Sequence, residues 1–361
     1  MSARLGPRIG PDQVGQRVVI RRGLGQGRFA DVLGELLSWD RDGDGVARVL
    51  TRHGEVSVPL GQVVAGKPVP PPPVRRGAPH RAIGWEGLED VAADGWRPVE
   101  LEWLGVRGQG WRLRAAEGFT GRANSVLPLG DPGIPLDAAV DAAERWYADR
   151  GLGTRFCVPW PLDAPVLAAD EAGQRARDTT LDAVLRERGY ALDTPTLVLT
   201  AAVRDVARAV LQPGSPGVPP GLRLTVDDAP DDAWLAVYRY RGQPLPEVAR
   251  RLLLSAPAQA FVSLRDDDGT VAVGRAASSR GWTGITAMEV VEPYRRRGLA
   301  RLVLGAIAEW GLARGDRSAY LQVAEHNAAA RSLYRAVGFA EHHGYHYRVR
   351  PQPQTTWSSG M

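Results

Sequence analysis

VVEPYRRRGLARLVL, residues 290–304, joins a predicted strand to a predicted helix. Residues 285–291, ITAMEVV, are rich in strand-forming side chains and predict the strand. Apolar residues recur at helical spacing over 299–315 and predict the helix. The run Arg295–Arg297 therefore lies in a strand-to-helix loop.

A helix start exposes backbone N–H groups that have no partner inside the helix, and the helix dipole makes this end electropositive. Gly298 would let an oxyanion approach those groups, and Ala300 is small enough to allow the same. Arginine near a helix N-terminus opposes the dipole unless an anion is bound, so the pattern favours a diphosphate cradle. The alternative is an ordinary helix start with surface arginines. The loop is neither a P-loop nor a dinucleotide fingerprint, because both glycine patterns are absent.

The composition predicts a soluble, cytoplasmic bacterial protein. The chain has 361 residues, 44% of them hydrophobic and 24% charged, and it lacks an apolar run long enough for a membrane span or a signal peptide. Its single cysteine, Cys157, fits a reducing compartment and predicts a small buried side chain. Lys67 is the only lysine, which indicates the arginine bias of a GC-rich genome. Acidic residues are interleaved with the arginines, so nucleic-acid binding is not expected.

Two proline-rich stretches, 66–79 and 212–221, predict linkers. Short alternating runs before the first linker predict a small all-β barrel, with DRDGDG at 40–45 as a hairpin turn. The expected division is a barrel at 1–66, a linker at 67–81, an α/β unit at 82–211, a linker at 212–221, an α/β unit at 222–350 and a disordered tail at 351–361.

The two α/β segments resemble each other. Trp146 and Gly151 at the end of the predicted helix 136–151 have the same spacing as Trp310 and Gly315. A second predicted helix in each segment ends in similar residues, RGYA at 188–191 and VGFA at 337–340, before a strand. We infer two tandem copies of one helix–strand–helix–strand unit.

Two motifs resemble a known family. Arg295-x-x-Gly298-x-Ala300 resembles the acetyl-CoA loop of the GNAT N-acetyltransferases, [QR]-x-x-G-x-[GA]. The run from Asn327 to Tyr334, followed by Gly338-Phe339, resembles the second GNAT signature, and the similarity covers about 222–350. The layout also resembles an actinobacterial family described as histone-acetyltransferase-like. It implies an α/β (α+β) fold of tandem GNAT-like acyl-CoA N-acyltransferase units preceded by a small SH3-like β-barrel.

The resemblance implies roles for single residues. Amides from Arg296 to Arg301 would hold the pyrophosphate of acetyl-CoA, and Val290 would polarise the thioester carbonyl. Tyr334 would protonate the departing thiolate. The implied cofactor-binding residues are Met288, Val290, Arg295, Arg296, Arg297, Gly298, Leu299, Ala300, Arg301 and Asn327.

The general base stays open. Glu289 is the first candidate, while Glu325 and a water chain are alternatives. Gln322 stands at another position where the family can carry a glutamate, and an amide cannot act as a base.

The predicted activity is acetyl-CoA-dependent N-acetylation of a primary amine, on a protein lysine or a small molecule, in a ternary complex. The alternative is a CoA-binding sensor or scaffold that uses the barrel for a protein partner. No membrane partner is expected. The acidic run 227–232 would attract a cationic amine if it borders the acceptor site, and is otherwise a solvated turn.

The first copy departs from the pattern. Its corner is PLGDPGIPLD at 128–137, where Asp131 would repel a diphosphate, and Leu185 replaces the tyrosine. This copy is therefore expected not to bind acetyl-CoA and to form a wall of the substrate site. Residues 118–126, GFTGRANSV, would face that site or form an ordinary turn.

The cluster HHGYHY at 342–347 predicts no metal site, because alternate residues of a strand point to opposite faces. A polar strand that lines the acceptor site is the preferred interpretation.

Overall fold

The computed structural model describes residues 9–25, 27–41, 43–51, 54–69, 78–164, 166–169, 175–177, 179–210, 217–239 and 245–350. The chain forms two compact units, Met1–Arg76 and Gly77–Met361, which we call unit 1 and unit 2. Parts of both expected linkers, 70–77 and 212–216, and the whole expected tail lie outside the described residues.

Unit 1 is a five-stranded antiparallel sheet in the order β4-β3-β2-β1-β5. Its strands are β1 (Arg17–Gly25), β2 (Arg28–Trp39), β3 (Val46–Thr51), β4 (Gly54–Pro59) and β5 (Val63–Pro68), with short 3-10 turns at Pro11–Gln13 and Leu60–Gln62. Val18, Ile20, Leu36 and Val49 form its buried core. The expected all-β unit and the hairpin at 40–45 are confirmed. The described pairings leave β4 and β5 as free edges, so the sheet is open and not a closed barrel.

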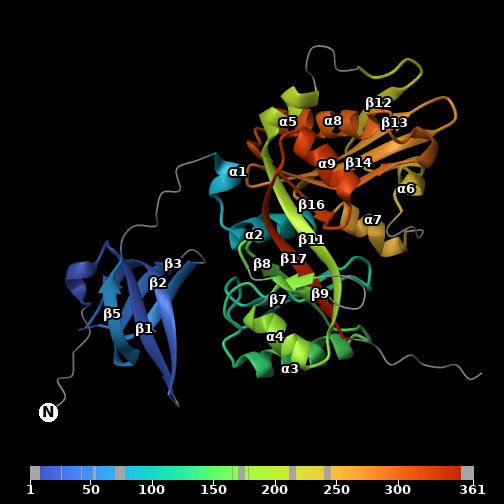
Figure 1. Ribbon diagram of the computed structural model, residues 1–361. Helices are drawn as coiled ribbons and strands as arrows, with labels where there is room; N and C mark the ends of the chain where they lie inside the picture. The colour runs from blue at the N-terminus through green and yellow to red at the C-terminus, as the bar shows by residue number, and fades with distance from the viewer. Residues whose placement is uncertain are drawn as a thin grey trace, which may run out of the picture. The chain divides into compact units, whose positions relative to one another are not determined.

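Unit 2 is built on an eight-stranded sheet in the order β12-β13-β14-β15-β16-β11-β17-β8 (Figure 1). Its strands are β8 (Arg155–Trp160), β11 (Ala191–Ala202), β12 (Arg223–Asp227), β13 (Ala258–Arg265), β14 (Thr270–Ser279), β15 (Trp282–Val290), β16 (Ser318–Ala324) and β17 (Ala340–Val349). Two small antiparallel pairs accompany it: β6 (Glu100–Leu104) with β7 (Trp111–Ala115), and β9 (Val166–Ala169) with β10 (Arg175–Arg177).

Helices cover both faces of the large sheet. They are α1 (Pro79–Ala82), α2 (Trp85–Gly95), α3 (Leu136–Ala148), α4 (Thr180–Glu187), α5 (Val203–Val210), α6 (Asp232–Val237), α7 (Glu247–Leu253), α8 (Leu299–Ala313) and α9 (Ala328–Ala336), with a 3-10 turn at Glu292–Tyr294. Side chains of α5, α8 and α9 share one core with Ala276, Ile285 and Leu321; we call this side the α8 face. Side chains of α2, α6 and α7 pack on the opposite side, the α2 face.

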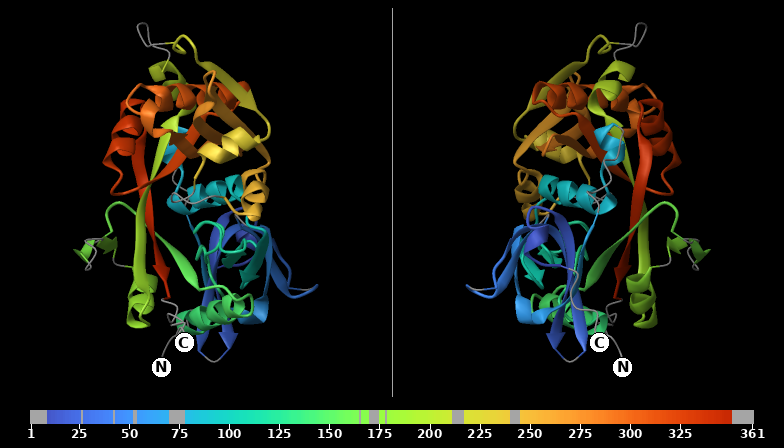
Figure 2. Two further views of the ribbon diagram at one scale, coloured as in Figure 1. Left: turned by 90° about the vertical axis from the view of Figure 1, so that its right-hand side faces the viewer. Right: turned by 90° about the vertical axis from the view of Figure 1, so that its left-hand side faces the viewer.

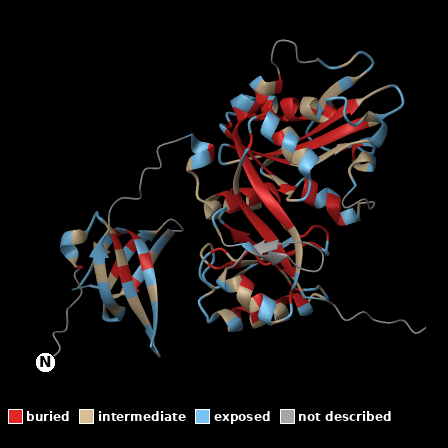
Figure 3. Cartoon of the chain, in the orientation of Figure 1, coloured by how far each residue is buried: buried red, intermediate tan, exposed pale blue. Residues whose placement is uncertain are grey.

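The two α/β copies share the large sheet. Strand β11 follows the helix of the first copy, yet it lies between β16 and β17 of the second, with Leu199 opposite both Leu321 and Glu341. Strand β17 pairs in turn with β8 of the first copy. The two long strands run side by side through unit 2 (Figure 2), and most of their residues are buried (Figure 3). Each copy therefore depends on a strand of the other for its complete sheet.

Equivalent helix ends confirm the tandem repeat. After α3 and after α8, a glycine with positive φ, Gly151 or Gly315, closes the helix with a hydrogen bond to the residue three earlier. After α4 and after α9, Gly189 and Gly338 do the same. Glycine is favoured at these ends because only it adopts the left-handed conformation without strain.

Candidate active site

The central parallel strands of the second copy separate at one end. Strand β15 pairs with β16 from Trp282 opposite Ser318 to Ile285 opposite Leu321, and the described pairing stops there. A bulge follows on β15, where Ala287 has a φ of 54° and the register with β14 shifts. Parallel pairing thus gives way to a gap whose β15 side carries unpaired backbone groups.

The backbone amides of Met288 and Val290 face this gap. The Val291 amide donates to the Val271 carbonyl of β14 at 3.0 Å, so the amides at Val290 and Met288, one and three residues earlier, point away from β14. The Met288 side chain turns to the α8 face, where its sulfur would lie 2.8 Å from a Cβ added at Gly274. The strand edge is therefore open to an extended ligand that pairs with its main chain.

The loop after β15 places two left-handed residues before α8. Arg296 has a φ of 65° and Gly298 a φ of 80°, and a Cβ built at Gly298 meets no atom within 4 Å. A non-glycine residue seldom adopts the conformation of Arg296, and such conformations gather at functional sites. Alternating right- and left-handed residues turn successive N–H groups towards one point and form an anion-binding nest.

The first turn of α8 defines which amides are available to a ligand. The Arg301 amide donates to the Gly298 carbonyl at 3.0 Å, so it already serves the helix. The amides of Gly298, Leu299 and Ala300 precede the first intrahelical donor. Leu299 is buried and Ala300 half-buried, whereas Gly298 is exposed.

The arginine side chains of the loop have different partners. Arg295 donates through Nε to the Val290 carbonyl at 3.0 Å and through Nη2 to Glu289 at 3.2 Å. The Arg297 guanidinium lies 5.0 Å from the centre of the Tyr294 ring. Arg301 donates to the Ala209 carbonyl near the end of α5. Arg295 thus ties the loop to β15, Arg301 ties α8 to α5, and Arg296 and Arg297 stay exposed.

Tyr334 lies on α9 in the core of the α8 face, with 8% of its surface exposed and its ring 6.0 Å from that of Phe339. Burial raises the pKa of its phenol to about 12, so the hydroxyl keeps its proton at neutral pH. Asn327 caps α9, because its Oδ1 accepts the Ala330 amide at 3.1 Å. Only its side-chain NH₂ group is then left as a donor to a ligand.

The candidate bases have different surroundings. Glu289 forms the ion pair with Arg295 described above. Gln322 follows the last residue of β16 that pairs with β15, and its buried Nε2 has no partner among the described residues. The main chain of Glu325 is held by bonds to Pro195 and Arg331. The acidic run 227–232 lies at the end of β12, three strands from β15 in the sheet.

Two buried histidines of β17, His343 and His346, contact different carboxylates. His343 Nε2 lies 3.1 Å from Glu89 of α2, while His346 Nε2 lies 2.6 Å from Asp182 of α4. Arg348 also binds Asp182, with Nε–Oδ1 and Nη2–Oδ2 distances of 2.7 and 2.9 Å. The described part of the chain holds no group of three His, Cys, Asp or Glu side chains arranged for a metal.

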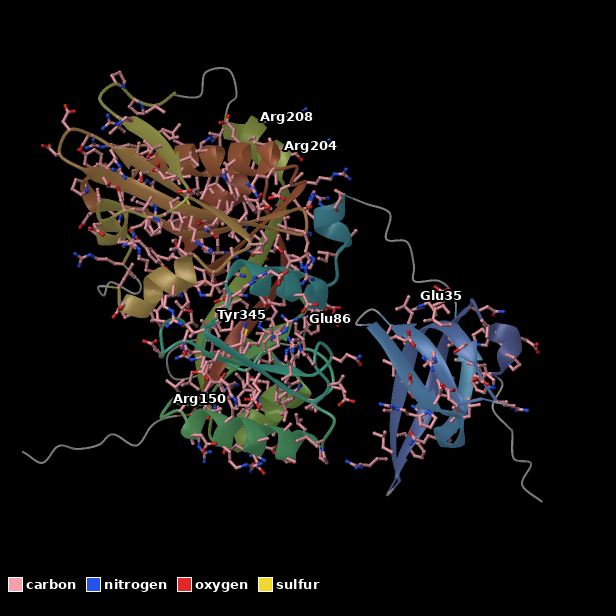
Figure 4. The ribbon with its side chains drawn as sticks, turned by 180° about the vertical axis from the view of Figure 1, so that it is seen from behind. Glu35, Glu86, Arg150, Arg204, Arg208 and Tyr345 are labelled. Atoms are coloured by element: carbon pink, nitrogen blue, oxygen red, sulfur yellow. The ribbon has the colours of Figure 1, made fainter. Side chains whose placement is uncertain are left out.

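Sequence reasoning missed a set of buried charges on the α2 face. Arg275 of β14 is completely buried, and Glu89 forms an ion pair with Arg122 at 3.4 Å. Arg122 lies in the segment 118–126, and its guanidinium is 5.2 Å from the ring of Tyr345, which Figure 4 labels inside unit 2. A lone arginine in the apolar run VAVGRAA was the available signal for Arg275. Cys157 is buried as expected, and burial raises its pKa to about 12.

No described helix is long and apolar enough to cross a membrane. A protein-family model described as "Probable histone acetyltransferase Rv0428c C-terminal" matches residues 86–348, more than half of the chain. A Mycobacterium tuberculosis protein named "Probable histone acetyltransferase Rv0428c" is 29% identical over 355 residues, which span 96% of this chain and 98% of the relative. A Bacillus subtilis protein, "Uncharacterized N-acetyltransferase YobR", is 25% identical over 73% of this chain and 97% of its own length.

Among solved structures, a "Tandem GNAT protein from the clavulanic acid biosynthesis pathway" has a TM-score of 0.53. It is 15% identical to this chain and covers 77% of this chain and 92% of its own, so it supports the fold alone. The predicted GNAT resemblance is confirmed. The chain belongs to the family of the probable histone acetyltransferase Rv0428c C-terminal region and is a GNAT-type N-acetyltransferase.

Proposed function

We propose that the second α/β copy, residues 222–350, binds acetyl-CoA and transfers its acetyl group directly to a primary amine. The observation that carries this proposal is the open corner at the start of α8. There, two left-handed residues, Arg296 and Gly298, precede unpaired helix amides, and a ligand meets no side chain at Gly298. Such a corner suits a diphosphate, because it supplies N–H donors, a helix dipole and fixed positive charge together.

The gap between β15 and β16 would hold the arm of the coenzyme. The Met288 and Val290 amides would pair with it as an added strand does, and Asn327 would donate from the other side of the gap. The Val290 N–H is the donor proposed for the thioester carbonyl. It would stabilise the negative charge that develops on the oxygen when the amine attacks.

The proposed reaction forms a C–N bond and breaks the C–S bond of the thioester. The electron pair of the C–S bond leaves on sulfur, and Tyr334 supplies a proton to the thiolate. A phenol whose pKa is raised to about 12 suits this role, because it is fully protonated at neutral pH. The amine loses a proton in the same reaction; Glu289 on β15, the first candidate base, would accept it, and its ion pair with Arg295 would have to open.

The remaining segments have supporting roles in this proposal. Residues 82–211 donate β11 and cover the α2 face, and they would not bind acetyl-CoA themselves. Unit 1, which contains the expected barrel 1–66, would bind a protein partner. The M. tuberculosis relative is named a probable histone acetyltransferase, so a protein lysine is one candidate acceptor alongside small amines.

Calorimetry with acetyl-CoA, followed by a thiol-release assay with a panel of amines, tests the proposal. We expect one acetyl-CoA per chain and amine-dependent release of CoA. Binding without transfer to any amine would favour the alternative of a CoA-binding sensor or scaffold. Absence of binding would contradict both.

A further inference from the structure

Two sides of the gap between β15 and β16 are already assigned in the proposed function. Tyr334 and α8 occupy the α8 face of the strands, and the proposed coenzyme enters from the loop before α8. The amine therefore approaches the thioester from the α2 face. Thr286 stands there, directly after the last β15 residue that pairs with β16.

Arg275 is a buried positive charge next to Thr286. It lies on β14 with none of its surface exposed, and its Nη1 donates to Thr286 Oγ1 at 3.3 Å. Its other bonds go to main-chain carbonyls, from Nε to Leu253 at 2.7 Å and from Nη1 to Gly95 at 3.1 Å. The Trp96 ring lies 5.1 Å from the guanidinium carbon. Every one of these partners is neutral.

The charge of Arg275 is not balanced locally. Among the described residues no carboxylate pairs with it, and its buried Nη2 has no hydrogen-bond partner. Burial lowers the pKa of the guanidinium to about 10, so it still carries its charge at neutral pH. A buried cation without a counter-ion is costly, and nearby negative charge relieves that cost.

The carboxylates of α2 that lie on the same face are already occupied. Glu89 binds His343 at 3.1 Å and Arg122 at 3.4 Å, and these partners hold its pKa at about 2 although burial would raise it. Asp94 accepts from Ser279 at 3.0 Å and from Arg280 at 2.8 Å.

Two further donors on this face lack partners, Arg122 Nη2 and Gln322 Nε2. Arg122 and Arg275 both lower the pKa of Tyr320 against the effect of burial. Beside the gap, Arg275 and Gln322 thus offer N–H donors without partners, while the Glu289 carboxylate is paired with Arg295.

We infer that the acceptor is an amine that also carries a negatively charged group, such as a carboxylate, and that Arg275 selects it. The inference rests on the proposed acetyl transfer. A fixed positive charge at this point attracts an anionic acceptor and repels a second ammonium group. Polyamines and lysine-rich peptides are therefore poor acceptors, and acidic amines of matched length are good ones.

A charge-matched acceptor series tests the inference on the wild-type protein. For each of several chain lengths it contains an ω-amino acid, the alkylamine and the diamine, which present the same amine beside a negative, neutral or positive group. Tripeptides with one lysine and acidic, neutral or basic neighbours extend it. We expect kcat/KM to fall in the order negative, neutral, positive, with at least ~10-fold between the extremes. A neutral or cationic best acceptor would overturn the inference.

Two variants assign the preference to Arg275. In Arg275→Met the ranking should flatten to within ~3-fold, and in Arg275→Lys, which keeps the charge, part of the ranking should remain. Arg223→Met, at the β12 edge of the sheet, removes an arginine far from the gap and should keep the wild-type ranking. Circular dichroism and acetyl-CoA calorimetry confirm that each variant is folded and binds the coenzyme. A folded Arg275→Met protein with the wild-type ranking would show that Arg275 only clamps α2 and α7.

The same data separate this inference from the proposed function. If acetyl-CoA does not bind or no amine releases CoA, the proposed function fails. If amines are acetylated without regard to their charge, the proposed function stands and the inference about the acceptor fails.

Discussion

The strand-to-helix corners of the two copies show what a binding site requires beyond the fold. At the second corner, Arg296 and Gly298 are left-handed, and a Cβ at Gly298 would meet open space. At the first corner, Gly130 is also left-handed, with a φ of 90°, but a Cβ there would lie 2.0 Å from the Gln109 carbonyl oxygen. The corner before α8 is thus open at Gly298, whereas the corner before α3 is filled at Gly130 by the protein's own loop.

Hydrogen bonds and charge reinforce this difference. The Asp131 amide of the first corner donates to the Gln109 carbonyl at 2.9 Å, and its carboxylate accepts the Gly133 amide at 2.8 Å. Two amides of this corner are therefore used internally, and a negative charge stands beside them. The first copy thus has the same architecture with a corner that is filled at Gly130 and carries an acidic side chain, so the architecture alone does not make a coenzyme site.

The largest difference between the two corners should appear in the variant Gly298→Val. A side chain there would occupy the space proposed for the diphosphate and remove several charge-assisted hydrogen bonds, so acetyl-CoA affinity in calorimetry should fall by at least ~100-fold. Gly315→Val is the matched control, because Gly315 at the other end of α8 has a similar φ of 85° and equally open surroundings. Equal affinities of the two variants would contradict the proposed cradle.

Tyr334 on α9 and Tyr190, which follows α4, allow a second test, of the proposed general acid. Tyr334→Phe should lower kcat by roughly 100-fold, since the general acid is lost, and should leave the Kd for acetyl-CoA nearly unchanged. The control is Tyr190→Phe in the first copy, a buried tyrosine whose hydroxyl bonds Glu144 at 2.9 Å. It should lower stability but not kcat. Unchanged turnover of Tyr334→Phe would show that Tyr334 is only a core residue, as Leu185 is in the first copy.

The junction of the two copies gives a prediction about acid stability. Glu89 of α2 has its pKa lowered to about 2, so its contribution is present above about pH 4.5 and is lost as the pH falls towards 2. The wild-type free energy of unfolding should drop by roughly 3 kcal/mol over this range from Glu89 alone. In urea titrations, Glu89→Gln should be less stable at pH 7 and show a flatter decline below pH 4.5. Parallel pH curves for the two proteins would mean that Glu89 is not held by Arg122 and His343.

Single charges at the two corners should have the smallest effects. Arg297 is exposed and stacks on Tyr294, so Arg297→Gln should weaken acetyl-CoA binding by about 3- to 10-fold at low salt and less at high salt. Asp131→Asn should change the affinity by less than ~2-fold, because the first corner stays filled by residues 105–109. A second acetyl-CoA site in Asp131→Asn would show that charge alone had closed that corner.

Much of this arrangement follows from local sequence. The apolar stripe after Gly298 fixes α8, Asp131 and the two prolines of DPGIP mark the first corner as unlike the second, and the repeated helix ends mark the two copies. Each of these depends on residues within a few positions of one another. Short-range patterns therefore predicted the helices and strands around the loop, and the diphosphate role of the loop stays a prediction.

Long-range pairing was beyond the sequence. Residues 196–201 predict an ordinary strand, and nothing local states that this strand lies between β16 and β17 rather than beside β8. The open sheet of unit 1 is of the same kind, since strand runs do not reveal whether the edges meet. Arg275 and Glu89 were missed because their significance depends on burial and on partners distant in the chain.

A crystal structure of the protein with bound acetyl-CoA tests the central claim most directly. We predict one coenzyme per chain, with its diphosphate on the amides of Gly298, Leu299 and Ala300 and its arm along Met288 and Val290. A diphosphate bound at residues 128–137 of the first copy, or at neither corner, would contradict the account.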